Sequence, residues 1–274
     1  MLQRHRAISL TPLSHCFSLV SQKKEHAAFQ KIVAVPERCC AVIPSSTAFT
    51  DGVVLPLAIS TAAAGLFQKG FLELPHPVVS SGGPQPSNKT IVVWGGSSSV
   101  GTLAIQLARA AGVDVITTAS KHNHDYCQSL GASKVFDHSS PSVIEDIVSA
   151  VKQSGKHLAG IYDSISLEAS IKACSTILEQ AGGDKKLVLV MPGSESSANK
   201  GIDAKAVFAV SVFTDYKEVG QAVWGRFVPE ALKSGALKPL PEAFVIGKGL
   251  EKIQAGMDKN KEGVSAKKVV VDLA

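Results

Sequence analysis

The chain has 274 residues, of which 45% are hydrophobic and 19% are charged, and its formal net charge at pH 7 is +5. This composition is typical of a globular protein with one large or two modest domains. Lysine and arginine are scattered rather than clustered, which argues against a nucleic-acid surface. No run of about 18 consecutive apolar residues predicts a membrane span.

Residues 1–24 differ in composition from everything that follows. They contain basic residues and serines, and the first acidic residue is Glu25. Such a composition occurs in mitochondrial transit peptides and in disordered leaders. We favour the second interpretation and predict a disordered leader over residues 1–25 of a cytoplasmic protein, with mitochondrial import as the alternative.

Two short strands, a helix and a loop are predicted next. Residues 29–44 alternate as two β segments around a turn. Residues 55–69 are rich in alanine and leucine at helical spacing, with Pro56 in the first turn and Gly70 at the end. Turn-forming residues fill positions 80–89.

The following region alternates apolar strands with amphipathic helices. Strands are predicted at residues 90–94, 113–119, 134–137, 158–163, 186–192 and 206–213. Helices are predicted between them at residues 100–111, 122–130, 141–153 and 167–180. This alternation predicts a parallel sheet covered on both faces, which is the α/β doubly wound (Rossmann) fold. Helices at 217–233 and 249–259 and strands at 243–246 and 267–273 complete the chain.

The turn after the first of these strands is a candidate phosphate-binding loop, Gly95-Gly96-Ser97-Ser98-Ser99-Val100-Gly101. Glycines let the chain reverse tightly and approach a ligand closely. Free backbone N–H groups of Ser98, Ser99 and Val100, together with the helix dipole, would bind a pyrophosphate. The alternative is a glycine-rich turn of an unrelated α/β protein that binds another ligand.

The end of the second strand favours NADPH over NADH. In NAD-binding sites an acidic residue about 20 positions after the loop grips the 2′-hydroxyl of the ribose. Here no acid stands at the end of the strand, and Ser120 and Lys121 follow it instead. A lysine at that edge suits a 2′-phosphate, although a solvated surface lysine is the alternative.

Three motifs in this order resemble the medium-chain dehydrogenase/reductase superfamily: the loop, Leu130-Gly131-Ala132 before Val135-Phe136-Asp137, and Tyr162-Asp163-Ser164. The likeness extends over about residues 29–274, and its order is more specific than any single motif. The sequence is most similar to the zinc-independent enoyl reductase and quinone reductase branch, especially fungal members that act beside polyketide synthases.

The resemblance implies a set of cofactor contacts. Ser120 and Lys121 would hold the 2′-phosphate, and His138 stands where many relatives carry a tyrosine beside the same phosphate. Ser164 and Ile165 would border the ribose and the nicotinamide, with plain packing as the alternative for Ile165. The pyrophosphate would contact the loop residues Gly96, Ser97, Ser98, Ser99 and Val100.

The resemblance also implies a division into domains. Residues 1–25 are unassigned, residues 26–60 are a remnant of a β-rich, chaperonin-10-like substrate domain, residues 61–237 are the Rossmann domain, and residues 238–274 return to the substrate domain. Most strands of that substrate domain are not found in this sequence. We therefore expect a shortened protein, a mispredicted gene model or a pseudo-enzyme, and the second explanation is favoured.

No metal is expected, because the sequence lacks a CxxC pair, a Gly-His-Glu motif and a close cysteine quartet. The predicted activity is NADPH-dependent hydride transfer to an activated C=C bond of an enoyl thioester, enone or quinone. The substrate would be a small molecule or an acyl-carrier-bound chain, with a polyketide synthase as the implied partner, and the protein a monomer or homodimer. The catalytic residues stay unassigned. The alternatives are a relative of the zinc-type alcohol and ketone oxidoreductases and a non-catalytic NADPH-binding module.

Overall fold

The computed structural model describes residues 14–16 and 40–273. The predicted leader lies almost entirely outside the described residues, as does most of the strand pair predicted at 29–44. The two described pieces meet in a small antiparallel pair, in which β1 (Ser14–Cys16) lies beside β2 (Cys40–Val42). Cys40 is disulfide-bonded.

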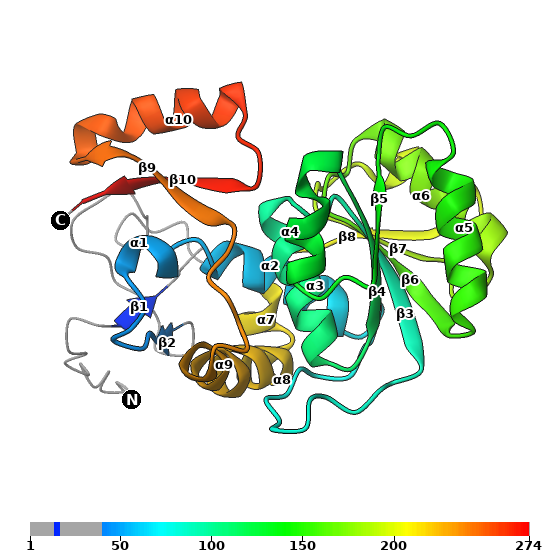
Figure 1. Cartoon of the computed structure of the whole chain (residues 1–274), viewed down its shortest axis with the longest axis horizontal. Coiled ribbons are helices and arrows are strands. Elements are labelled where there is room, and N and C mark those ends of the chain that lie inside the picture. Colours follow the sequence, from blue (N-terminus) through cyan, green and yellow to red (C-terminus); the bar gives the residue numbers. More distant parts are fainter. Residues whose placement is uncertain (1–13, 17–39, 274) are drawn as a thin grey trace, which may run out of the picture.

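A six-stranded parallel sheet organises the molecule (Figure 1). Its strand order is β5-β4-β3-β6-β7-β8, so the chain first adds strands on one side of β3 and then crosses to the other. The strands are β3 (Lys89–Trp94), β4 (Asp114–Ala119), β5 (Lys134–Asp137), β6 (His157–Asp163), β7 (Lys186–Leu189) and β8 (Asp203–Ala206).

Helices cover both faces of this sheet, as the sequence predicts for a doubly wound fold. One face carries α2, α3 and α4, and the opposite face carries α5 and α6 (Figure 1). These helices are α2 (Pro56–Phe67), α3 (Ser99–Ala110), α4 (His124–Ser129), α5 (Val143–Ser154) and α6 (Glu168–Ala181).

Helix α2 is the core helix of the first face. The stretch Phe49–Phe67, which joins α1 (Phe49–Gly52) to α2, is long and apolar enough to cross a membrane, but 72% of it is buried inside the protein. A Cβ on Gly65 would lie 2.4 Å from Val188 Cγ1, because α2 packs directly onto the sheet. Its apolar composition therefore fits a core helix. The predicted domain boundary between residues 60 and 61 falls inside α2, and the division into domains stays a prediction.

The sixth strand was predicted in the wrong place. The apolar run 206–213 was expected to form it, but β8 ends at Ala206, and Ser211–Thr214 form the short helix α7. An edge strand contacts only one neighbour, so polar residues such as Asp203 and Lys205 are tolerated on it. Of the apolar residues that follow, Val207, Val212 and Phe213 are buried in the core that includes α2, whereas Phe208 is exposed.

The last part of the chain forms a helical segment and a separate two-stranded sheet. The predicted helix at 217–233 is α8 (Lys217–Gly220), the π-helix η5 (Gln221–Phe227) and α9 (Val228–Ser234) in succession. Strands β9 (Glu242–Lys248) and β10 (Lys267–Asp272) are parallel and are joined by η6 (Leu250–Lys252) and α10 (Ile253–Glu262). Figure 1 shows this unit beside the Rossmann sheet, on the side of α2.

Candidate functional site

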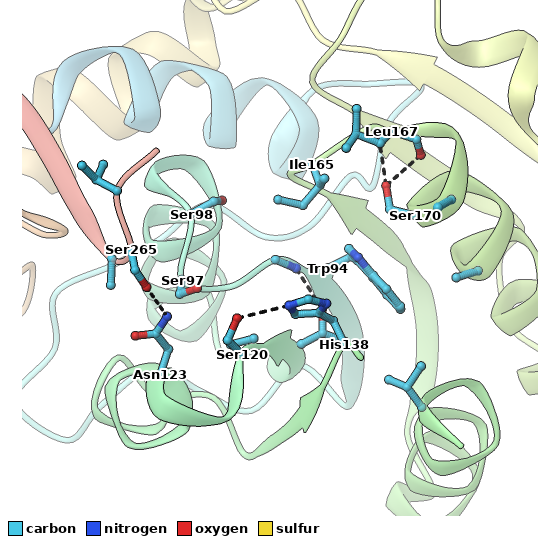
Figure 2. Close-up of a pocket in the computed structure, with 18 residues that line it drawn as sticks. Trp94, Ser97, Ser98, Ser120, Asn123, His138, Ile165, Leu167, Ser170 and Ser265 are labelled. Carbon is cyan, nitrogen blue, oxygen red and sulfur yellow. Dashed lines mark hydrogen bonds between the residues drawn. The ribbon is translucent and has the colours of Figure 1, made fainter. Parts of the chain in front are cut away.

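A cavity of about 620 Å³ opens at the carboxyl edge of the central sheet (Figure 2). Its walls come from the ends of β3, β4, β5 and β6 and from the segment before β10. The chain changes direction across the sheet between β3 and β6, and in doubly wound folds such a switch point is where ligands bind. The cavity therefore lies where a nucleotide is expected.

The turn from β3 to α3 is built for close approach. Gly95 has a φ of +81°, which L-residues with a side chain rarely adopt. A Cβ on Gly101 would lie 2.3 Å from the carbonyl oxygen of Gly95, and one on Gly96 would lie 2.2 Å from Thr117 Oγ1. Only glycine at these positions lets α3 begin directly against the turn and the sheet.

The hydrogen bonds of this turn decide which backbone donors remain for a ligand. Ser98 is the N-cap of α3, and its hydroxyl accepts from the Gly101 N–H at 3.0 Å. The Ser98 N–H donates to the Gly95 carbonyl at 3.0 Å, so the expectation that it is free is wrong. Among the described residues, the N–H groups of Ser97, Ser99 and Val100 have no hydrogen-bond acceptor. These three donors can bind an anion at the positive end of the helix dipole.

The β6–α6 turn holds the phosphate loop from the other side. Ser164 Oγ lies 2.6 Å from the Trp94 carbonyl and 2.9 Å from the Gly95 carbonyl, so it can donate to either. Ser164 is buried and does not line the cavity. Ile165 does line it and is 37% exposed, and Figure 2 shows its side chain projecting beside Ser98.

The opposite end of the cavity brings Ser120 and His138 together. Ser120 Oγ lies 3.2 Å from His138 Nε2, although the two residues follow different strands (Figure 2). Lys121 begins the 3₁₀ turn η3 (Lys121–Asn123) and is exposed, outside the set of residues that line the cavity. The predicted residues thus divide into two groups. The cavity is lined by Ser97, Ser98, Ser120, His138 and Ile165, whereas Gly96, Ser99, Val100, Lys121 and Ser164 lie behind or beside it.

The C-terminal segment contributes residues that the sequence analysis missed. Ser265 lines the cavity, and its hydroxyl accepts a hydrogen bond from Asn123 Nδ2 at 3.0 Å. Lys268 Nζ donates to Ser99 Oγ at 3.2 Å, at the first turn of α3. Burial lowers the pKa of Lys268, and within the described part of the chain no carboxylate forms an ion pair with it. A desolvated cation at the positive end of a helix is unfavourable without an anion nearby.

No metal-binding set is found in residues 14–16 and 40–273, where no three His, Cys, Asp or Glu side chains come together. The two free cysteines of this part, Cys127 and Cys174, are both buried. Burial raises the pKa of the Cys127 thiol to about 12, and burial together with the nearby charge of Asp163 raises that of Cys174. A raised pKa disfavours the thiolate form in both, which is typical of buried structural cysteines.

Comparison with known proteins places the site in a family context. Residues 99–213 match the family model of the zinc-binding dehydrogenases. The chain is 40% identical over 264 residues to the trans-enoyl reductase himH of Aspergillus japonicus, covering 96% of this chain and 73% of the relative. It is 36% identical over 272 residues to the dehydrogenase orsE of Emericella nidulans, covering 95% and 76% respectively.

Solved structures show the same fold. An alcohol dehydrogenase superfamily protein from Novosphingobium aromaticivorans superposes with a TM-score of 0.64 at 21% identity, over 88% of this chain and 69% of that one. A mycobacterial protein, Rv1454c, solved in complex with NADPH, superposes with a TM-score of 0.58 at 18% identity, over 87% of this chain and 69% of that one.

Proposed function

This chain belongs to the medium-chain dehydrogenase/reductase family, as a relative of fungal trans-enoyl reductases and dehydrogenases, and we propose that it uses NADPH to reduce an activated C=C bond. The substrate class would be an α,β-unsaturated thioester, ketone or quinone, free or carried on the acyl carrier of a polyketide synthase. The name of the himH relative, a trans-enoyl reductase, supports this class of reaction.

The β3–α3 turn is the observation that carries the proposal. Its three unpaired N–H groups, on Ser97, Ser99 and Val100, meet at a helix N-terminus, and Lys268 lies 3.2 Å from the hydroxyl of Ser99. Donors and a cation that converge in this way suit a pyrophosphate. Glycines at which a Cβ would clash with the turn or the sheet let α3 begin directly after β3, which places these donors at the helix N-terminus.

The preference for NADPH rests on the far end of the cavity. Ser120 and His138 can both donate to a phosphate, and Lys121 is the next residue along the chain. No carboxylate lines the described cavity, so none is there to repel a 2′-phosphate or to accept from a 2′-hydroxyl. The NADPH complex of the structurally similar mycobacterial protein is consistent with this choice.

The cofactor, when bound, supplies the hydride that the substrate accepts. The residues of this chain bind and orient it. The free N–H groups and Lys268 hold the phosphates, and Ile165 and Trp94 provide apolar surface that keeps water from the cavity wall. Because no side chain of the described residues can be assigned as an acid at the reacting carbon, the proton that completes the reduction has no assigned donor.

A turnover assay tests the proposed activity. We expect the purified chain to oxidise NADPH when a crotonyl thioester or a quinone is added, and to convert little NADP⁺ in the presence of simple alcohols. Alcohol oxidation without reduction of the C=C substrates would assign the chain to the alcohol and ketone oxidoreductases instead. Tight NADPH binding without turnover of any of these substrates would show a non-catalytic binding module.

Replacement of Lys268 by alanine tests the pyrophosphate contact. We expect Lys268→Ala to weaken NADPH and NADH by the same factor, about tenfold, because both cofactors carry the pyrophosphate that the lysine would pair with. The neighbouring Lys267→Ala is the matched control, since Lys267 forms an exposed ion pair with Glu242 at 2.8 Å and should leave both affinities unchanged. A loss confined to NADPH, measured by fluorescence titration, would contradict the assignment.

A further inference from the structure

We propose that Asp163 is a positioning residue of the cofactor site, whose carboxylate holds the β6–α6 turn in the shape that fixes the phosphate loop and seats Ile165 against it. The inference rests on the proposed function, because it concerns how well the chain holds the cofactor.

Asp163 organises the turn that follows β6. Its side chain is fully buried. Oδ1 accepts from the N–H groups of Ile165 at 2.9 Å and Ser166 at 3.0 Å, and Oδ2 accepts from the Ser170 hydroxyl at 2.6 Å. Ser166 has a φ of +55°, in the left-handed region that costs energy for a residue with a Cβ. The carboxylate thus stabilises a turn that would otherwise relax.

Burial of the Asp163 carboxylate costs free energy. Burial raises the pKa of Asp163, and the hydrogen bonds from Ser166, Ser170 and Ile165 lower it. No lysine, arginine or histidine of the described residues forms an ion pair with Asp163. A buried carboxylate without a cation is unfavourable unless hydrogen bonds offset its desolvation. A buried carboxylate at position 163 is explained if the β6–α6 turn must keep a single conformation.

The turn transmits that shape to the phosphate loop through two residues. Ser164 Oγ reaches the carbonyls of Trp94 and Gly95 and accepts from the Ser98 hydroxyl at 2.9 Å. Ile165 lies directly over Gly95, since a Cβ on that glycine would be 2.6 Å from Ile165 Cγ1. Movement of the turn would therefore move the N-cap of α3 and open the wall that Ile165 forms.

A further bond ties the same turn to the next strand. Ser166 Oγ accepts from the Val190 N–H at 2.8 Å, just beyond β7. The Ser120–His138 pair lies on the other side of β3, at the ends of β4 and β5. Asp163 should therefore control the pyrophosphate and nicotinamide half of the cavity and leave the 2′-phosphate half unaffected.

Two ligands separate these halves: NADPH and 2′-AMP, which contains only adenosine with its 2′-phosphate and lacks both phosphates of the pyrophosphate. We expect Asp163→Ala to reduce NADPH affinity and turnover about tenfold each, because the N–H groups of the turn lose their acceptor. Affinity for 2′-AMP should change by less than about twofold. Asp163→Asn should restore most of the loss, because its amide oxygen can accept from both N–H groups while its NH₂ donates to Ser170 Oγ.

Controls make each outcome decisive. Asp146→Ala removes an exposed aspartate that accepts from the Ser142 hydroxyl at 2.8 Å and should change neither ligand. If Asp163→Ala does not fold, Ser164→Ala should show the same selective loss of NADPH. Equal losses for NADPH and 2′-AMP, or an Asp163→Asn protein as impaired as Asp163→Ala, would overturn the positioning role. Failure of the unmodified chain to bind either ligand would reject the proposed function itself.

Discussion

Gly101→Ala should strongly weaken NADPH binding and destabilise the protein. A Cβ at this position would lie 2.3 Å from the Gly95 carbonyl oxygen and 2.9 Å from Gly96 Cα, both backbone atoms that cannot rotate away. The start of α3 must therefore move, and the N–H groups of Ser99 and Val100 move with it. We expect the free energy of unfolding to fall by about 2 kcal/mol. NADPH affinity should fall about a hundredfold, which corresponds to the loss of about 3 kcal/mol of charge-assisted hydrogen bonding.

Whether a Gly→Ala substitution raises or lowers the stability distinguishes an open helical position from a tightly packed one. In an open helical position alanine is more favourable than glycine by about 1 kcal/mol. Gly225 is such a position, because it is exposed in η5 and a Cβ there would meet only Gln221 Cγ at 3.6 Å. Gly225→Ala should raise the melting temperature slightly and leave NADPH affinity unchanged. A Gly101→Ala protein that is equally stable and still binds NADPH would show that α3 does not need its close approach to the turn.

Ser120→Asp should reverse the preference between the two cofactors. Ser120 lines the cavity at the end of β4 and lies 3.2 Å from His138 Nε2. A carboxylate at this place would repel a 2′-phosphate by about 2 kcal/mol, or about thirtyfold in affinity. The same carboxylate can accept from the 2′-hydroxyl of NADH, so NADH affinity should hold or improve.

An uncharged variant isolates the effect of the charge. Ser120→Asn has nearly the shape of the aspartate variant and lacks its charge, so the ratio of NADPH to NADH affinity should stay within a few fold of the unmodified chain. Parallel losses for both cofactors in Ser120→Asp would place the 2′-phosphate elsewhere, and the exposed Lys121 could not then be counted as its partner.

Local patterns predicted most of the central fold. The strand at 134–137 has the bounds of β5, and the apolar strands β3, β4 and β6 are each within one residue of their predicted positions. Strands buried on both faces carry continuous apolar runs, which makes them easy to find. The edge strand β8 was misplaced because Asp203 and Lys205 interrupt that signal.

The site could be predicted only where its residues are close together along the sequence. Glycines between a strand and a helix indicated the phosphate loop. The Ser120-Lys121 pair predicted a binding site for the 2′-phosphate at the end of β4. The bond of the Ser98 N–H to Gly95 depends on the detailed shape of the turn, which a motif does not specify. Lys268 is 169 residues from Ser99 along the chain, so only the tertiary structure brings its charge to the start of α3.

Titration of the intact chain with NADPH and with NADH, followed by calorimetry under identical salt and pH, tests the central claim most directly. The account predicts that both cofactors bind and that NADPH binds at least about tenfold more tightly, because Ser120 and His138 add charge-assisted hydrogen bonds to its 2′-phosphate. Equal affinities, tighter binding of NADH, or no binding of either cofactor would contradict it.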